Sequence, residues 1–417
     1  MLHNRWPLLS IFLLAVTALL APSCSVGNKT AILWTDRPEF AFYGEYFNTS
    51  QSKYKVEIRY FDYPAAQLKN TKAYPDIVVG SWLKSASTRI FFKSLDAYFS
   101  SGKLSRSAFY PRLLAMGSID RTQYLLPVSF NAPALIFARD KGEQLSNPFT
   151  IGFDEMKKLG GAYNVESGGV YTRMGFSPLW DDDFLFITAT LFNASFREAS
   201  PLAWDSAALD LAMSFVYDWT HEVNTNIQAE EDFTFKYFFD PPARLAQSGR
   251  ILFTYMNSDV LFTLAEEGRN SLDFRWIMEQ NTIPLTEGAV YLGVPQKGKA
   301  PSAAAAFIRW FFLNETQRQL LERSKANHLS ESSFGIGGGF SALRPVTEQI
   351  FPQFYPGLLG HMPPADFLSP ANILPSNWIA LKERIILPYL RNRARSINRD
   401  NVYSLERRLA DWQRINR

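Results

Sequence analysis

The stretch "TQYLLPVSFNAPALIFARD", residues 122–140, decides how the fold of this 417-residue chain is interpreted. It contains two apolar runs, YLLPV and PALIF, which are joined by the polar residues SFN and punctuated by prolines. Short apolar runs bounded by turn residues are typical of buried strands. The pattern therefore indicates two buried segments that follow one another directly, with Asn131 at the polar turn between them.

Four segments upstream of this stretch show strand and helix patterns in alternation. AILWTD (31–36) and YPDIVVGSW (74–82) read as short buried strands, and YKVEIRYFDY (54–63) alternates apolar with charged residues. EFAFYGEYFN (39–48) has the apolar spacing of a helix. The first 80 residues thus predict the order strand, helix, strand, helix, strand, which implies a parallel sheet with helices on its faces.

The residues after 140 continue the mixture of helices and strands. SAALDLAMSFVYDWTHEV (206–223) is an amphipathic helix, and one long helix is expected over 300–324. Two further helices are expected at the C-terminus, over 377–396 and 401–415. At roughly 100–200 residues per domain, the chain beyond residue 23 is long enough for two domains.

The N-terminal residues have the pattern of a secretory signal peptide. Arg5 precedes the uncharged run Leu8–Ala21, whose 14 residues fall short of the roughly 20 that a membrane-spanning helix needs. Small residues follow at Ala21 and Ser23, at a spacing that a signal peptidase accepts. The sequence therefore predicts a signal peptide over 1–23 and an exported protein.

Cys24, the only cysteine in the chain, stands immediately after the predicted cleavage site. The residues LAPSC (20–24) resemble a bacterial lipobox, although Ala21 and Ser23 occupy the usual leucine and glycine or alanine positions. The resemblance implies that Cys24 carries lipid and that 24–30 is a lipid-anchored linker. It also implies attachment to the outer face of the cytoplasmic membrane. A single cysteine allows no intramolecular disulfide, so folding depends on the apolar core.

The composition supplies large cores and gives no sign of a nucleic-acid partner. Apolar residues make up 47% of the chain and aromatic residues 15%, while the formal net charge is +3. A nucleic-acid interface needs a clustered basic stripe. The one basic cluster, within 391–417, is interleaved with acidic residues and reads as the solvated faces of terminal helices.

Several pieces of the chain, in this order, resemble the extracellular sugar-type solute-binding proteins of bacterial ABC transporters. The resemblance spans most of the chain beyond residue 23 and rests on the order and spacing of the motifs more than on any one of them. The segments that carry it are PDIVVGSW (75–82), YLLPVSFNAPALIFARD (124–140), FTIGFDEMKKL (149–159), SGRILFTYMNSDVLF (248–262), GVPQKGKAPSAAAAFIRWFFLNETQRQLL (293–321) and LERRLADWQRINR (405–417).

This resemblance implies an α/β fold of two lobes, a type II-like periplasmic-binding-protein fold in which each lobe is a mainly parallel sheet flanked by helices. Crossover strands at the hinge would connect one lobe, 31–129 plus 286–330, to the other, 130–285 plus 331–417. A small-molecule solute, expected to be a saccharide, would bind in the cleft between the lobes. The transmembrane subunits of an ABC permease would be the protein partners.

Residues just after the predicted strands are the candidates for ligand contact. Sugars present apolar faces and a rim of hydroxyls, which aromatic planes and polar side chains match. In α/β sheets, ligands bind outside the carboxyl ends of the strands. The expected ligand-binding residues are Trp34, Asp36, Trp82, Phe130, Asn131, Trp180, Asp181, Asn257, Tyr291, Phe340 and Arg344.

Other roles stay open for several of these residues. Each aromatic side chain could instead belong to a core, and Asp181–Asp183 could form a solvated loop, a helix cap or a calcium site without the spacing of an EF-hand. Arg344 could form a surface ion pair. The glycine-rich GIGGGF (335–340) lacks the lysine and hydroxyl residue of a P-loop, which argues against a phosphate site.

No motif of a known catalytic class is evident, so we expect no enzyme, no cofactor and no metal. His221, His328 and His361 lie far apart, and neither a zinc-protease motif nor a nucleophile elbow is present. A glycosidase would need only two acids at the right distance, and no spacing selects such a pair. A non-sugar solute, either a polyamine or an anion, and a role as an adhesin or sensor partner remain alternatives.

Overall fold

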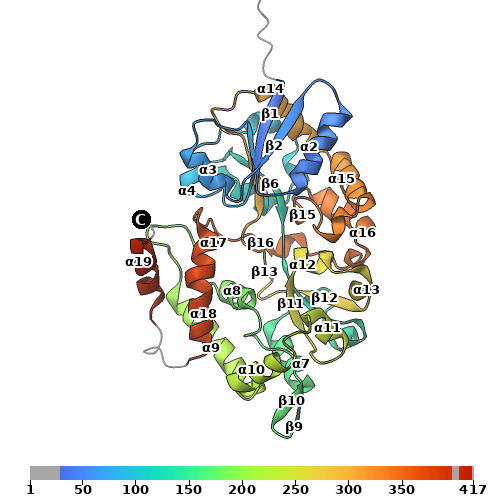
Figure 1. Cartoon of the computed structure of the whole chain (residues 1–417), viewed down its shortest axis with the longest axis vertical. Helices are drawn as coiled ribbons and strands as arrows, with labels where there is room; N and C mark the ends of the chain where they lie inside the picture. The colour runs from blue at the N-terminus through green and yellow to red at the C-terminus, as the bar shows by residue number, and fades with distance from the viewer. Residues whose placement is uncertain (1–28, 397–402, 416–417) are drawn as a thin grey trace, which may run out of the picture.

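Two β-sheets, each with its own helices, form two lobes in the computed structural model of this protein (Figure 1). The structure describes residues 29–396 and 403–415. The predicted signal peptide 1–23, the lipidation site Cys24 and most of the linker 24–30 lie outside the described residues. The predicted two-lobed α/β fold is confirmed.

The sheet of the first lobe is built from the strands that the sequence pattern predicted, together with strands that arrive later in the chain. Parallel pairs join β1 to β2 and to β3, whereas β14 pairs antiparallel with β3 and β6, and β15 pairs antiparallel with β6. In spatial order the strands are β15 (Phe340–Ser341), β6 (Leu125–Phe130), β14 (Val290–Gly293), β3 (Ile77–Gly80), β1 (Thr30–Thr35) and β2 (Lys55–Tyr60).

The sheet of the second lobe is smaller. Strands β11 and β12 pair antiparallel with β7, and β12 pairs parallel with β8. In spatial order its strands are β11 (Thr254–Asn257), β7 (Pro133–Ala138), β12 (Leu272–Ile277) and β8 (Thr150–Ile151). Two-stranded pairs are formed by β4 (Ser118–Ile119) with β5 (Thr122–Gln123), β9 (Val165–Ser167) with β10 (Val170–Arg173), and β13 (Ile283–Pro284) with β16 (Leu368–Ser369).

The expectation that both sheets are mainly parallel is wrong, because antiparallel pairings outnumber parallel ones in each. The cause is the repeated passage of the chain between the lobes. Strand β6 runs toward the second lobe, and β14 returns from it, so the two neighbours point in opposite directions.

The helices pack on the two sheets and, in the second lobe, also on one another. Those of the first lobe are α2 (Glu39–Ser50), α3 (Pro64–Asn70), α4 (Ala86–Arg89), α5 (Asp96–Ser100), α6 (Pro111–Met116), α14 (Pro301–Phe311), α15 (Asn314–Ala326) and α16 (Phe351–Phe354). Those of the second lobe are α7 (Phe153–Tyr163), α8 (Asp182–Leu191), α9 (Ser206–Val223), α10 (Ile227–Lys236), α11 (Pro242–Gln247), α12 (Ser258–Thr263), α13 (Glu266–Asn270), α17 (Trp378–Leu381), α18 (Leu387–Ala394) and α19 (Leu405–Ile415).

Short irregular helices complete the architecture. The 3₁₀ helices are η1 (Arg106–Ala108), η2 (Arg139–Gln144), η3 (Leu329–Glu331), η5 (Pro356–Leu358) and η6 (Ala365–Phe367). Two π-helical turns are η4 (Val346–Ile350), which leads into α16, and η7 (Lys382–Ile386), which joins α17 to α18. No helix within 29–396 and 403–415 combines the length and the apolar character needed to span a bilayer.

The amphipathic helix predicted over 206–223 is observed with the same bounds as α9, whereas the long helix predicted over 300–324 is divided. Leu313 has an extended backbone and separates α14 from α15. The helix α14 buries an alanine and phenylalanine face that includes Phe307 and Phe311, and α15 buries Leu320 and Leu321. The break allows each shorter helix to turn its own apolar face toward the lobe.

The chain crosses between the lobes three times, and the third crossing corrects a predicted boundary. The first crossing lies between β6 and β7, and the second runs from β12 through β13 to β14. The sequence assigned all of 331–417 to the second lobe, but β15 pairs with β6 in the first sheet. The third crossing therefore comes later, at β16, which pairs with β13 between the two sheets (Figure 1).

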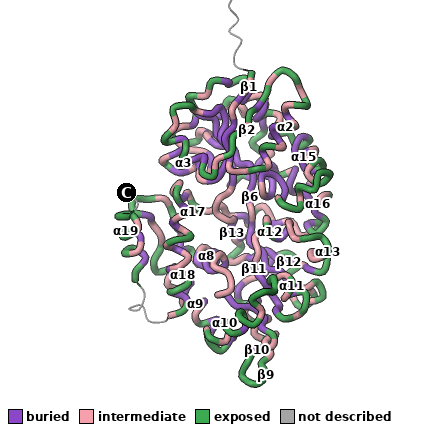
Figure 2. Tube along the Cα trace, viewed as in Figure 1, coloured by how far each residue is buried: buried purple, intermediate pink, exposed green. Residues whose placement is uncertain are grey.

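The buried residues follow the two sheets and the helices packed on them (Figure 2). A separate apolar cluster joins α8 and α9 to the C-terminal helices α18 and α19, and it includes Trp378. Helices far apart in sequence thus form one wall of the second lobe, and α17 extends from this wall toward the first lobe (Figure 1).

Candidate ligand-binding site

A cavity of about 610 Å³ lies between the two lobes. The carboxyl ends of β1, β3 and β6 open onto it from the first lobe. The second lobe contributes the start of α8, the end of β11, the start of α12 and the α17–η7 segment. Residues that line it include Asp36, Arg37, Tyr60, Asp62, Tyr63, Ser81, Trp82, Phe130, Asn131, Asp183, Phe186, Tyr255, Asn257, Asp259, Thr286, Glu287, Gly288, Trp378, Lys382 and Glu383.

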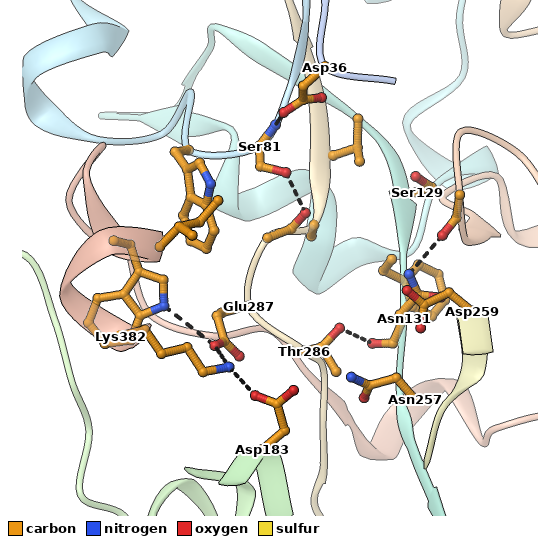
Figure 3. A pocket seen from close by; sticks show the side chains of 18 of the residues that line it. Asp36, Ser81, Ser129, Asn131, Asp183, Asn257, Asp259, Thr286, Glu287 and Lys382 are labelled. Carbon is orange, nitrogen blue, oxygen red and sulfur yellow. Dashed lines mark hydrogen bonds and ion pairs between the residues drawn. The ribbon is translucent and has the colours of Figure 1, made fainter. Parts of the chain in front are cut away.

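Asp36 organises the first-lobe edge of the cavity. Its carboxylate accepts a hydrogen bond from the backbone N–H of Ser81 (3.1 Å; Figure 3). It also lies 3.1 Å from Nε of Arg37. Burial raises the pKa of Asp36, and the Arg37 guanidinium only partly offsets this effect. The ends of β1 and β3 are thereby tied together where a ligand would meet them.

Trp82 has a backbone conformation that is rare for a large side chain. Its φ of 64° lies in the left-handed region, and such strain is concentrated at functional positions. The Ser81 hydroxyl donates to the Gly288 carbonyl (2.9 Å), which holds the turn against the returning chain. Gly288 itself has φ of 95°, and a Cβ there would lie 3.4 Å from the Trp82 ring.

The Trp82 ring touches both lobes. It packs against the first-lobe cluster that contains Trp34 and Tyr291, and against the second-lobe cluster that contains Trp378. Since an aromatic plane can stack on the apolar face of a sugar, this ring is a candidate flat surface for a ligand at the cavity.

Lys382 connects the hinge to the second lobe at the opposite side of the cavity. Its Nζ lies 2.6 Å from Oδ1 of Asp183 and also forms an ion pair with Glu287 (Figure 3). Burial lowers the pKa of Lys382, but the two carboxylates together raise it by more than burial lowers it. The pKa of Lys382 is therefore above its ordinary value. Trp378 Nε1 donates to the same Glu287 carboxylate (3.4 Å). The π-helical turn η7 begins at Lys382 and presents it beside Glu383 on the cavity wall.

Asn131 links the crossings of the chain behind the cavity. Its amide donates to the Gly338 carbonyl (2.8 Å), and its side-chain oxygen accepts from the Ser258 hydroxyl (2.7 Å). Its backbone carbonyl accepts from the N–H of Thr286 (3.0 Å). Asn131, which is itself on the first crossing, therefore contacts the glycine-rich loop before β15, the second crossing and the start of α12.

Tyr255 and Asn257 form the second-lobe floor. The Tyr255 hydroxyl donates to the Asn257 side-chain oxygen (3.0 Å), which leaves the Asn257 amide N–H groups for a ligand. Burial raises the pKa of Tyr255 well above its ordinary value, and the carboxylates of Asp183, Asp181 and Glu287 add to the rise, as does that of Asp259. This phenol thus lies among several negative charges.

The structure brings together five of the predicted ligand-binding residues at this cavity. They are Asp36, Trp82, Phe130, Asn131 and Asn257. Each stands at or just after the carboxyl end of a strand, and the strand ends of a sheet gather at one edge. Their roles in binding stay predictions.

Four of the other predicted residues belong to the first lobe and lie outside the cavity. Trp34 is buried and packs on Phe61, with 4.6 Å between ring centroids. The hydroxyl of buried Tyr291 donates to the backbone of the α6 helix, and Phe340 is enclosed in an aromatic core. Arg344 is exposed and pairs with Glu348 (2.7 Å), which matches the surface ion pair left open by the sequence. Trp34, Tyr291 and Phe340 are strand residues, and because alternate strand residues face opposite sides of a sheet, their side chains pack in the core.

Trp180 and Asp181 lie outside it for a different reason. Asp181 is the N-cap of α8 and accepts from the N–H groups of Asp183 (2.8 Å) and Phe184 (3.3 Å). Trp180 stacks on Phe233 in a separate, smaller pocket within the second lobe. The helix-cap alternative therefore accounts for Asp181, and within 29–396 and 403–415 no group of three or more potential ligands is placed to hold a metal ion.

Sequence reasoning missed most of the second-lobe wall. Lys382 and Trp378 were interpreted only as parts of a terminal helix, and no local pattern marks them as cavity residues. The sequence did contain a signal for two cavity residues. Asp259 lies two positions after the selected residue Asn257, and Glu287 lies on the crossover that leads to β14. Only the third crossing of the chain brings α17 and η7 to the cleft.

Comparisons with known proteins give structural matches without sequence matches. No model of a known protein family matches the chain, and no curated protein sequence matches it. The cyclic α-maltosyl-1,6-maltose-binding protein of Arthrobacter globiformis matches with a TM-score of 0.62 at 15% identity, over 92% of this chain and 97% of that chain. The sugar-binding protein MalE of Xanthomonas citri matches with a TM-score of 0.62 at 12% identity, over 93% and 96%.

A third match is an ABC substrate-binding protein of Listeria monocytogenes in complex with cycloalternan, with a TM-score of 0.60 at 11% identity, over 93% of this chain and 97% of that chain. The chain has the fold of a two-lobed substrate-binding protein. These structural neighbours are binding proteins rather than enzymes. At such low identity the match establishes the fold, and the function has to be argued from the cavity.

Proposed function

We propose that this protein is the substrate-binding receptor of an ABC-type importer and that it captures a saccharide between its lobes without chemical turnover. The observation that carries the proposal is the cavity itself. It combines aromatic surfaces with carboxylates and amides and receives them from both lobes. Aromatic planes suit the apolar faces of sugars, and the polar groups suit their hydroxyls.

Contacts from both lobes give the ligand a means to stabilise the closed form. Trp82 approaches from the first lobe, Asn257 from the second, and Glu287 from the returning crossover. A ligand that touches all three gains more free energy in the closed arrangement than in an open one, so binding shifts the population toward closure.

Delivery of the solute to permease subunits follows from the same proposal, as does the location of the protein. The predicted signal peptide 1–23 would direct export, and lipid on Cys24 would tether the receptor to the outer face of the cytoplasmic membrane. Lipid anchoring of this kind needs more than one acyl chain, because one chain alone gives marginal binding. Cys24→Ser is expected to release the processed protein from the membrane fraction. Processed Cys24→Ser protein that stays membrane-bound contradicts the tether.

The experiment that tests the function is a thermal-shift screen of residues 25–417 against neutral and charged mono- and oligosaccharides, with polyamines and small anions as controls. A ligand at 100 times its Kd adds about 2.7 kcal/mol of stability, which is a clear rise in Tm. A saccharide that stabilises the protein and is recovered unchanged supports the proposal. Stabilisation by anions alone, or cleavage of the bound glycoside, contradicts it.

A further inference from the structure

The cavity carries more negative charge than its own cations can match. Among the described residues, six carboxylates line it, from Asp36, Asp62, Asp183, Asp259, Glu287 and Glu383, against two cations, from Arg37 and Lys382. Carboxylates that only accept hydrogen bonds from hydroxyls do not require such an excess. The imbalance therefore bears on the charge of the ligand.

The two cations form ion pairs with only some of these carboxylates. Arg37 pairs with Asp36, and Lys382 is shared by Asp183 and Glu287. Asp62 and Glu383 are exposed at the rim, where water screens them. Asp259 is the exception among the described residues, because it is only partly exposed and no cation lies within ion-pair distance of its carboxylate.

Asp259 lies at the start of α12, on the same side of the cavity as Asn131 and Asn257 (Figure 3). Its Oδ1 accepts one hydrogen bond, from the N–H of Val260 (3.0 Å). The charged groups that act on it from the facing elements are Arg37 of the first lobe, at longer range, and Asp183 of α8, which has the same sign.

We propose that the saccharide carries a positively charged amino group and that Asp259 binds this ammonium. The proposal rests on the proposed function. The cavity already holds one ammonium between carboxylates, that of Lys382. A second ammonium at Asp259 would receive the same chemistry from the carboxylate, and the amide N–H groups of Asn257 would remain for the hydroxyls of the sugar.

A neutral saccharide fits this charge pattern poorly. Closure over a neutral ligand would remove water from Asp259 without a compensating cation, and a buried unpaired carboxylate is costly. A linear polyamine would match the charge but would leave the Trp82 plane and the amide groups of Asn257 without hydroxyls or sugar faces to bind. An amino-saccharide uses both sets of groups.

The test is isothermal titration calorimetry of residues 25–417 with chemical pairs. Glucosamine and galactosamine oligomers of one to four residues are compared with their fully N-acetylated counterparts, which differ by the charge on nitrogen. Neutral glucose and mannose oligomers and spermidine complete the panel. At least one amino-saccharide is expected to bind about tenfold or more tightly than its N-acetylated counterpart at low salt, because charged hydrogen bonds are the stronger ones. Added salt should reduce this preference.

Two variants locate the effect. Asp259→Asn should abolish the preference for the charged sugar, whereas Asp140→Asn removes the same charge from an exposed position outside the cavity and should preserve it. A melting curve of each variant shows that it is folded. A preference that survives Asp259→Asn overturns the assignment of Asp259.

The remaining outcomes separate the two proposals. Equal or tighter binding of N-acetylated or neutral sugars overturns the inference and leaves the saccharide receptor intact. Binding of spermidine alone, with loss in Asp259→Asn, places a cation at Asp259 but overturns the saccharide. Failure of every sugar to bind folded protein contradicts the proposed function itself.

Discussion

The cleft around Trp82 and the pocket around Trp180 contain similar residues but differ in their place in the fold. Both set a tryptophan among aromatic side chains close to an acidic residue. The Trp82 cavity measures about 610 Å³ and is built by both lobes, whereas the Trp180 pocket measures about 220 Å³ and is built by the second lobe alone. Trp180 stacks on Phe233 with 5.8 Å between ring centroids.

The acids of the two regions differ even more. Asp181 beside Trp180 caps α8. Nearby Glu230 is buried, and its carboxylate accepts hydrogen bonds from Ser177 (2.7 Å) and Asn224 (2.6 Å). The carboxylates of the cleft are aimed between the lobes, and one of them, Asp259, has no cationic partner among the described residues. A ligand in a pocket inside one lobe cannot drive closure of the two lobes. Because both regions contain a tryptophan and acidic residues, residue composition alone does not distinguish a ligand site from a packed core.

The largest expected effect concerns the charges of the cleft. Lys382→Met should destabilise the protein by about 2 kcal/mol, because it leaves the nearly buried Glu287 without its cation. Denaturant unfolding measures this effect. Arg344→Met removes an exposed ion pair and should change stability by less than about 1 kcal/mol. Equal losses in the two variants would show that the Lys382 bridge is no stronger than a surface pair.

The two tryptophans give the second contrast. Trp82→Ala should weaken ligand binding about tenfold or more, since a stacked aromatic contact and part of the interlobe packing are lost. Trp180→Ala should lower the stability of the second lobe and leave the affinity nearly unchanged. Affinity by calorimetry and stability by denaturant unfolding are measured on both. Similar affinities for Trp82→Ala and the unaltered protein would remove Trp82 from the site.

The third contrast concerns contacts that join the lobes at the rim of the cleft. The Glu198 carboxylate of the second lobe accepts from the Ser85 hydroxyl (2.5 Å) and from the N–H of Ala86 (2.7 Å) in the first lobe. Glu198→Gln should open the unliganded protein and reduce affinity about fivefold, since each such bond contributes about 1 kcal/mol. The radius of gyration from small-angle scattering measures the opening.

Glu222→Gln is the matched control for Glu198→Gln, because Glu222 pairs with Lys157 inside the second lobe (2.6 Å). It should change neither the radius of gyration nor the affinity. An unaltered radius in Glu198→Gln would mean that this contact does not hold the lobes together.

The smallest expected effect is a pH dependence of stability. Burial raises the pKa of Asp259, so the folded protein holds a proton there more tightly than the unfolded chain, whose pKa is near the ordinary 3.8. The stability penalty is absent below the unfolded-state pKa and grows as the pH rises through the folded-state pKa. Asp259→Asn should therefore raise Tm at pH 7 by about 2 °C and leave it nearly unchanged near pH 3.5.

Thermal unfolding at the two pH values checks this expectation, with Asp62→Asn as the exposed control. A lower Tm of Asp259→Asn at pH 7 would show that the ionised carboxylate stabilises the unliganded fold. In that case Asp259 would not be waiting for a ligand cation.

The sequence by itself determined the alternation of strands and helices and the position of the first crossing. It also placed the polar residues that follow β1, β3, β6 and β11. These features depend on local periodicity and on turn residues, which place polar side chains at the carboxyl ends of the strands. That is why Asp36, Trp82, Asn131 and Asn257 could be selected before the structure was known.

Only the tertiary structure decided which side of a strand each aromatic residue faces, that β15 returns to the first sheet, and that Lys382 closes the cleft. The pairing of Lys382 with Asp183 joins residues about 200 positions apart. No local pattern encodes such a contact, because it exists only after the third crossing lays the C-terminal helices against α8. The charge of the cavity, and with it the inferred charge of the ligand, is a property of this assembly.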